Sequence, residues 1–180
     1  ISVTSGVTYD SMLDVPTMWA DGSTNRGNYA VWNAVKLQGN SASDGNLKAT
    51  LTAGGPPYIA GYGVRSTISA PSSGKWYCEI TPVAYDVWSY VGVADVNGWA
   101  VDIGTAGQNS VVYRANGDKN VNGTASAYGA SYTTDVIGIA LDKDANTVTF
   151  YKNNASQGSI NLPSTTIDYC FVVYNGNGTS

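Results

Sequence analysis

The residue types that could perform chemistry are few in this sequence. The chain contains no histidine, so the commonest general base and the commonest transition-metal ligand are both absent. Catalytic sites built on Ser–His–Asp or Cys–His arrangements are therefore excluded within this chain. A glycosidase would need two carboxylates roughly 5–9.5 Å apart. Glu79 is the only glutamate, and no second acid lies two or four residues away from it. We expect Glu79 to pair with a base such as Arg65 or to make a polar contact on its sheet, and we expect the protein not to be an enzyme.

Asp142, Asp144 and Asn146 have the spacing with which a calcium-binding loop begins. Such a loop also needs a glycine at its sixth position and a bidentate glutamate at its twelfth. The corresponding residues here are Thr147 and Asn153. We therefore predict a plain turn between two strands, and we expect no metal and no cofactor.

Composition limits the partners. Charged residues make up 12% of the chain and the net charge is −4. The nine Lys and Arg residues are scattered, whereas phosphate binding needs clusters of them, so we expect no nucleic-acid binding. No apolar run approaches the length of a membrane span, and we expect no membrane insertion. A surface built from Ser, Thr, Asn, Gly and Tyr is typical of adhesive, extracellular or virion-surface β proteins.

The segment from Asp135 to Asn154 shows the clearest structural pattern. Two alternating stretches flank a short polar break, which predicts a hairpin in which Asp142 faces Thr147. This register places large apolar side chains on one face of the hairpin: Ile137, Ile139, Leu141, Val148 and Phe150. The other face carries small groups such as Gly138 and Ala140, which would let a second layer approach.

The rest of the chain predicts further strands and no helix, because no window shows a helical period. We expect these strands at residues 29–36, 47–52, 64–69, 75–81, 88–94, 99–103, 110–115, 157–162 and 169–174. Residues 116–134 are interpreted as one long loop with at most one weak strand. The predicted fold class is all-β, an antiparallel β-sandwich, preceded by an irregular N-terminal arm at residues 1–28.

Two cysteines are too few for a disulfide framework. Cys78 and Cys170 each lie in an apolar strand pattern. We expect two buried free thiols; a disulfide would require neighbouring strands, which the sequence leaves open.

From Gly74 onward, the order of motifs resembles the SPRY domain, a concanavalin-like β-sandwich of the jelly-roll type. The likeness covers a little over half of the chain. The motifs are Gly74-Lys75-Trp76-Tyr77-Cys78-Glu79-Ile80, Tyr90-Val91-Gly92-Val93-Ala94, Tyr128-Gly129, Asp135-Val136-Ile137-Gly138-Ile139-Ala140-Leu141-Asp142 and Val148-Thr149-Phe150-Tyr151-Lys152-Asn153. Thr134 and Asn154 replace glycines that are usual in the family. The likeness implies one SPRY-like domain at residues 29–180 and one more sheet-closing strand, supplied by the N-terminal third or by residues beyond Ser180.

The N-terminal third is similar to SPRY-like modules of tailed-phage virion proteins. The similar stretches are Asp14-Val15-Pro16-Thr17, Gly27-Asn28-Tyr29-Ala30-Val31, Gly45-Asn46-Leu47 and Val64-Arg65-Ser66-Thr67-Ile68. This resemblance implies a protein of the virion surface that is assembled in the host cytoplasm.

Three loops rich in aromatic and polar residues are the candidate recognition surface, because loops on a rigid sandwich usually carry binding. In the SPRY family the ligand surface is likewise formed by loops at one end of the sandwich. The candidate ligand-binding residues are Tyr85, Asp86, Trp88, Trp99, Asp102, Arg114, Tyr128 and Tyr132.

The resulting functional hypothesis is a non-enzymatic phage surface protein, such as a tail-fibre or receptor-binding module. It would bind a host surface glycan or protein, contact other virion proteins and form a homo-oligomer. One alternative is a structural capsid-decoration or tail-joining protein that is attached through residues 1–28. Another alternative is an intracellular SPRY adapter that binds a short peptide.

Overall fold

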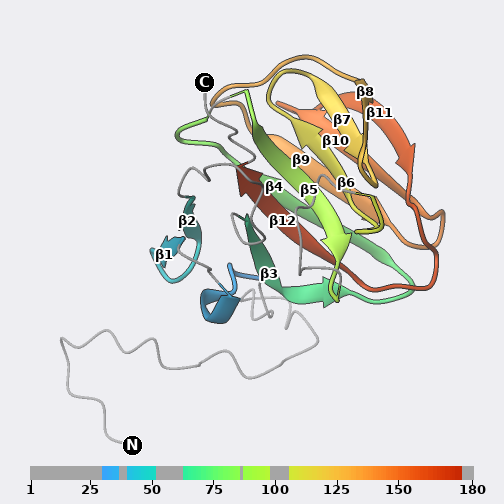
Figure 1. Cartoon of the computed structure of the whole chain (residues 1–180), viewed down its shortest axis with the longest axis horizontal. Coiled ribbons are helices and arrows are strands. Elements are labelled where there is room, and N and C mark those ends of the chain that lie inside the picture. Colours follow the sequence, from blue (N-terminus) through green and yellow to red (C-terminus); the bar gives the residue numbers. More distant parts are fainter. Residues whose placement is uncertain (1–29, 37–39, 52–62, 86, 98–105, 176–180) are drawn as a thin grey trace, which may run out of the picture.

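A computed structural model of the chain describes residues 30–36, 40–51, 63–85, 87–97 and 106–175. In this part of the chain, two antiparallel sheets share one core and form the expected β-sandwich (Figure 1). One sheet has four strands in the order β11-β10-β9-β4. The other has six strands in the order β3-β12-β5-β6-β7-β8. A short hairpin of β1 and β2 lies beside the sandwich.

The four-stranded sheet comprises β4 (Lys75–Ile80), β9 (Ile137–Asp142), β10 (Thr147–Lys152) and β11 (Ala155–Asn161). The six-stranded sheet comprises β3 (Gly63–Ala70), β5 (Ser89–Asp95), β6 (Val111–Arg114), β7 (Asp118–Val121), β8 (Thr124–Ala127) and β12 (Tyr169–Asn175). The side hairpin is β1 (Ser41–Ser43) and β2 (Lys48–Thr50), and a 3-10 turn, η1, spans Ala34–Lys36. None of the described helices is long and apolar enough to cross a membrane.

The predicted β9–β10 hairpin is confirmed together with its register. Asp142 pairs with Thr147 and Ile139 pairs with Phe150. The five large apolar side chains of its inner face are each at most 1% exposed. They pack against Val93, Val111 and Tyr113 of the six-stranded sheet in one core. Burial of each such side chain stabilises the fold by about 1.5–3 kcal/mol, so this face is a main source of stability.

The outer face of the hairpin differs from the expected covered layer. A side chain at Gly138 would lie 2.5 Å from the hydroxyl of Tyr77, so the tyrosine of β4 rests directly on this glycine. Tyr77 is itself 54% exposed. The small residues therefore accommodate one aromatic ring on a surface and not a second packed layer.

Two predicted elements also differ. A strand is predicted at residues 29–36, but among the described residues 30–36 only Trp32 makes a bridge, to Ser66, and η1 follows. Residues 116–134 contain β7 and β8 where a loop was expected. Their polar sequences lack an apolar pattern; β7 forms by pairing with β6, and β8 by pairing with β7. The sequence signal for this hairpin is the Asn122-Gly123 pair, which is typical of a two-residue hairpin turn. Both residues have the positive φ that such a turn requires.

The N-terminal half of the chain supplies the strand that closes the six-stranded sheet. β3 pairs with β12, and the backbone of Val31 and Asn33 bonds to Thr67 and Arg65 on the outer edge of β3. The predicted arm at 1–28 and the predicted strand at 99–103 lie outside the described residues.

Replacement of Phe150 by alanine tests the role of the hairpin. Phe150 is fully buried, with its ring 5.5 Å from that of Tyr113, so Phe150→Ala should lower the free energy of unfolding by about 3–5 kcal/mol. Denaturant titration measures this, with Thr149→Ala on the outer face as the matched control, expected to cost less than about 1 kcal/mol. Equal losses in both variants would contradict the assignment of this face to the core.

Candidate functional site

The loop between β4 and β5 exposes a row of apolar side chains. Pro82 follows the last residues of β4, and Val83, Tyr85 and Val87 are then 77%, 46% and 56% exposed. They occupy alternate positions of one short segment, which we call the loop tip. Three large exposed apolar groups so close together differ from single surface apolar residues, which need no explanation.

Arg114 holds the base of this loop. Its guanidinium carbon lies 3.7 Å from the centroid of the Trp88 ring, and its Nε donates a 2.7 Å hydrogen bond to the carbonyl of Val87. Its Nη1 lies 3.9 Å from a carboxylate oxygen of Asp118. The Arg114 side chain is 14% exposed, so its hydrogen-bonding groups face the protein itself. Arg114 and half-buried Trp88 therefore position the loop tip.

The strand register explains why Arg114 reaches Trp88. Tyr113 points into the core, so its neighbour Arg114 points to the outer face of the six-stranded sheet. Arg114 pairs with Tyr90 on β5, and Trp88 precedes β5 by one residue. A guanidinium stacked on an aromatic face combines cation–π attraction with a well-defined geometry.

Tyr132 was predicted to bind a ligand, and the structure corrects this. Its side chain is 1% exposed and its ring centroid lies 5.0 Å from that of Tyr113. The hydroxyl lies 3.0 Å and 3.1 Å from the carbonyls of Tyr113 and Ser89, to which it donates. Burial raises the pKa of this phenol strongly. Because these carbonyls satisfy the hydroxyl inside the protein, Tyr132 is a core residue.

Tyr128 is half-buried and joins the two sheets at their edge. Its ring lies edge-on to Tyr113, with centroids 5.3 Å apart, and its hydroxyl donates to the carbonyl of Gly158 on β11. On the other side, Lys119 Nζ lies 5.4 Å from the ring centroid. These contacts make Tyr128 an edge-closing residue that is removed from the loop tip.

The remaining three predicted residues, Asp86, Trp99 and Asp102, lie outside the described residues. Of the eight candidates, the structure thus brings Tyr85, Trp88 and Arg114 to one loop. Val83 and Val87 were missed. The sequence does carry a signal for these two residues: they alternate with Tyr85 as apolar positions directly after Pro82, the proline that ends the strand.

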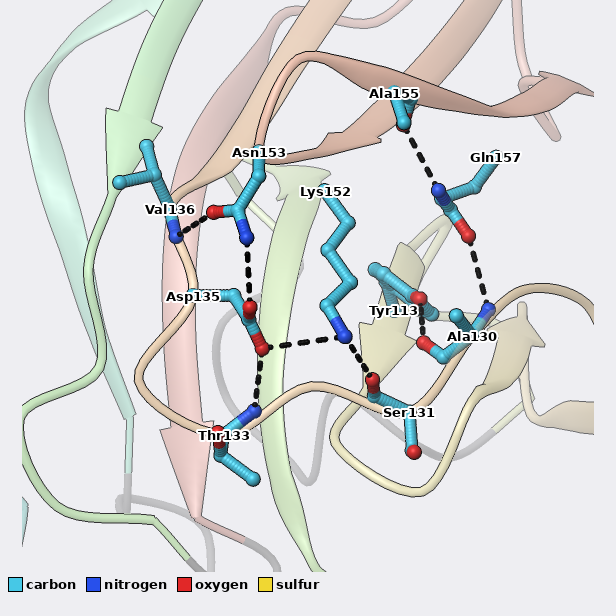
Figure 2. Close-up of polar contacts among 10 residues, drawn as sticks. All are labelled: Tyr113, Ala130, Ser131, Thr133, Asp135, Val136, Lys152, Asn153, Ala155 and Gln157. Atoms are coloured by element: carbon cyan, nitrogen blue, oxygen red, sulfur yellow. Dashed lines mark hydrogen bonds and ion pairs between the residues drawn. The ribbon is translucent and has the colours of Figure 1, made fainter.

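Figure 2 shows a polar clamp that ties residues 130–136 to β10 and β11. Asp135 accepts hydrogen bonds from the backbone of Thr133 and from the side chain of Asn153, at 3.0 Å and 2.8 Å. Asn153 in turn accepts from the backbone of Val136. Lys152 Nζ lies 3.3 Å from Asp135 and donates to Ser131. Two of the residues on which the family resemblance rests, Asp135 and Asn153, are thereby explained as structural.

Gln157 extends this clamp toward the core. Its Oε1 accepts a 2.9 Å hydrogen bond from the backbone of Ala130, and its Nε2 donates to the carbonyl of Ala155. Tyr113 donates its hydroxyl to the carbonyl of Ala130 (Figure 2). The segment that carries Tyr128 and Tyr132 is therefore held from both sides.

The carboxylates of the β9–β10 turn satisfy neighbouring groups of the chain. Asp142 accepts from the backbone of Ala145 and pairs with Lys75 at 3.0 Å. Asp144 accepts from the backbone of Gly74, and Asn146 has the left-handed φ of 55° that a turn uses. The predicted turn is confirmed. No group of three or more His, Cys, Asp or Glu that could hold a metal occurs in the described part of the chain.

The expectation of two free thiols is confirmed; Cys170 is buried as expected, whereas Cys78 is only partly buried. Cys78 lies on β4 and Cys170 on β12, in different sheets, and neither forms a disulfide. Burial raises the pKa of each thiol to about 12, so both stay protonated and unreactive near neutral pH. Glu79 accepts a 2.9 Å hydrogen bond from Tyr77, which is the polar sheet contact that the sequence had left as one alternative.

A recess of about 110 Å³ lies between the N-terminal segment and the sandwich. Trp32, Leu47, Phe171, Cys78 and Glu79 are among the residues that line it. Glu79 is the only carboxylate among the lining residues, so the recess lacks the acid pair that hydrolysis of a glycoside requires.

The clamp predicts a specific dependence of stability on pH. Hydrogen bonds from Thr133, Asn153 and Lys152 hold the pKa of Asp135 below its usual value. Its contribution is therefore complete above roughly pH 4, the pKa in the unfolded chain, and is lost as the pH falls through the lower folded pKa. Asp135→Asn should show a smaller loss of unfolding free energy on acidification, measured by denaturant titration between pH 5 and 2.

Asp142→Asn is the matched comparison, because hydrogen bonds that Asp142 accepts from the backbone of Ala145 and from Lys75 also lower its pKa. Each single variant should remove its own part of the acid dependence, and the double variant should remove both. An Asp135→Asn protein with the acid dependence of the wild type would show that the clamp does not contribute.

Comparison with known proteins identifies the fold. No family model matches the sequence, and no curated protein matches it. Among solved structures, the chain is similar to the PSpry domain of TRIM65, with a TM-score of 0.63, 18% identity, and coverage of 83% of this chain and 86% of that one. It is equally similar to the SPRY domain of human HERC1, with a TM-score of 0.63, 18% identity, and coverage of 82% and 91%. At this identity the likeness concerns the fold, and the chain has the SPRY fold.

Proposed function

We propose that this chain is a non-catalytic module that binds another protein through the loop tip of Val83, Tyr85 and Val87. The observation that carries the proposal is the exposure of these three apolar side chains on one short loop. Binding surfaces concentrate their energy in a few such anchors, and aromatic residues are prominent among them.

The base of the loop supports the proposal because it is held in place. The stack of Arg114 on Trp88 and its hydrogen bond to Val87 connect the loop to β6. A loop that is ordered before binding loses less conformational freedom on association, so more of the contact energy remains as affinity.

The exposed groups favour a protein over a glycan as the partner. Sugar rings are commonly held against bare aromatic faces, and one face of Trp88 is occupied by Arg114, which leaves Tyr85 as the exposed ring of the loop tip, between two valines. Val83 and Val87 are aliphatic and suit apolar side chains of a protein. The absence of catalysis remains part of the proposal, and the engagement of Glu79 by Tyr77 and of Asp142 by Lys75 supports it.

The proposed setting is the surface of a tailed-phage particle, in the host environment where such particles assemble. It rests on the resemblance of the N-terminal third to phage virion modules. The alternative role as a decoration or tail-joining protein uses the same setting, with residues 1–28 as the attachment. Particles assembled with a chain that lacks residues 1–28 would distinguish the two roles, since normal incorporation would argue against attachment through this arm.

The binding proposal is tested with a displayed library of random peptides selected on the immobilised full-length chain. Peptides that bind the wild type should bind Tyr85→Ala and Val87→Ser at least tenfold more weakly, measured by calorimetry. The control is Val35→Ser, because Val35 is 90% exposed but lies on η1, away from the loop.

Selected peptides that bind all three variants equally would place the binding surface elsewhere. A glycan array run with the same proteins forms the second arm. Glycan binding that is lost in Trp88→Ala and retained in Tyr85→Ala would replace the protein partner by a sugar.

A further inference from the structure

The outermost strand of the six-stranded sheet, β8, has an edge unlike the other three edges of the two sandwich sheets in the described part of the chain. Its residues Thr124–Ala127 are Thr, Ala, Ser and Ala, and all four are exposed. Natural sheet edges are usually protected from pairing by charges, proline, bulges or a covering segment. β8 has a small, uncharged edge with none of these features.

The other three edges of the sandwich sheets, those of β3, β11 and β4, each carry a protective feature. The outer edge of β3 is covered by the backbone of residues 31–33. β11 contains a bulge opposite Phe150 and Tyr151, and Tyr128 donates its hydroxyl to the carbonyl of Gly158. β4 carries Lys75 and Glu79 at exposed positions.

The pairing pattern shows which backbone groups of β8 point outward. Asn122 donates its N–H to the carbonyl of Ser110, which fixes the alternation along β7. Lys119 and Val121 therefore bond to Ser126 and Thr124, their partners across β7 and β8. Tyr128 donates its N–H back to Gly117, in the same alternation.

It follows that the N–H and C=O groups of Ala125 and Ala127 point away from β7. No partner for them occurs among the described residues. Four backbone groups, two donors and two acceptors, are thus directed outward from one short strand. Such a row is a template for an added strand.

We propose that β8 pairs with β8 of a second copy of this chain, antiparallel, about a two-fold axis at Ser126. In this register Ala125 of each copy exchanges hydrogen bonds with Ala127 of the other, which satisfies all four groups. A register centred on Ala125 would place Gly123, with φ of 90° in the turn, opposite Ala127. A register centred on Ala127 would place Ala125 opposite Gly129, which lies beyond the end of β8. The two six-stranded sheets become one continuous sheet across the dimer.

The charges near the edge suit a second copy. On β7, Asp118 is paired with Ala127 and Asn120 with Ala125. Because Ala127 of one copy pairs with Ala125 of the other, Asp118 of one copy lies in the same cross-strand row as Asn120 of the other. The two Lys119 residues are separated by both Ser126 residues, roughly 14 Å across three strand spacings, which exceeds the screening length of about 8 Å at physiological salt. No like charges are opposed. The interface is small, so the dimer belongs to the weak class.

A disulfide trap at the axis tests this pairing. Ser126 faces itself in a non-hydrogen-bonded pair, for which the Cα–Cα distance is about 4.5 Å, within the range that a disulfide spans. The full-length Ser126→Cys protein, oxidised in a glutathione buffer, should form a cross-linked dimer on a non-reducing gel. The wild type pairs without a covalent bond, and its cysteines Cys78 and Cys170 are partly or fully buried, so it should run as a monomer on the same denaturing gel.

Thr124→Cys is the matched control, because it is exposed on the same face of the same strand. The two copies of this position would lie roughly 14 Å apart in the proposed register, so it should cross-link at least tenfold more slowly. Adding Ala125→Pro to Ser126→Cys removes an outward N–H and leaves the β7 pairing intact, and this should abolish cross-linking without changing the thermal melt.

Equal cross-linking at positions 124 and 126 would indicate random collision and overturn the proposal. Absence of cross-linking by Ser126→Cys would do the same and leave the edge to a strand from another protein. The result is independent of the loop tip, since Tyr85→Ala should leave cross-linking unchanged.

Discussion

The structure depends on the burial of one face of the β9–β10 hairpin against the six-stranded sheet. Ile139, Leu141 and Phe150 are at most 1% exposed and share a core with strands that lie far away in sequence. Because side chains alternate along a strand, this burial fixes which residues of the hairpin face outward. It also fixes the positions on the sandwich at which the loops after each strand begin. The polar clamp of Asp135, Lys152 and Asn153 then attaches the preceding segment to the hairpin.

The same alternation positions the loop that we propose as the binding surface. Tyr113 faces the core, so Arg114 must face outward, where it covers Trp88 and bonds to Val87. Arg114 holds the base of the loop, and the exposed groups are the apolar side chains of the loop tip. A recognition surface of this kind is defined by shape and apolar area, with the cation as a support.

The loop tip and the β8 edge are separate surfaces, and they would serve separate contacts. The loop tip presents side chains, which can select a partner by their shapes. The β8 edge presents backbone groups and small side chains, which suit pairing with an extended strand of matching register. A module that pairs weakly through its edge could present two loop tips at once, and linked binding of two sites raises overall avidity without new contacts.

The sequence by itself determined the fold class and the hairpin register. Period-two patterns in β4 and in the β9–β10 hairpin specify which face is buried, and Asn146 specifies the turn. Only the tertiary structure decided the roles of individual aromatic residues. Tyr132 lies in a polar, glycine-rich segment, yet it is buried because the carbonyls that satisfy its hydroxyl come from Ser89 and Tyr113. Likewise, β7 and β8 lack an apolar pattern; β7 exists through pairing with β6, and β8 through pairing with β7. The physical reason is that a strand pattern is local, whereas the partners of a hydroxyl, a guanidinium or a sheet edge come from residues distant in sequence.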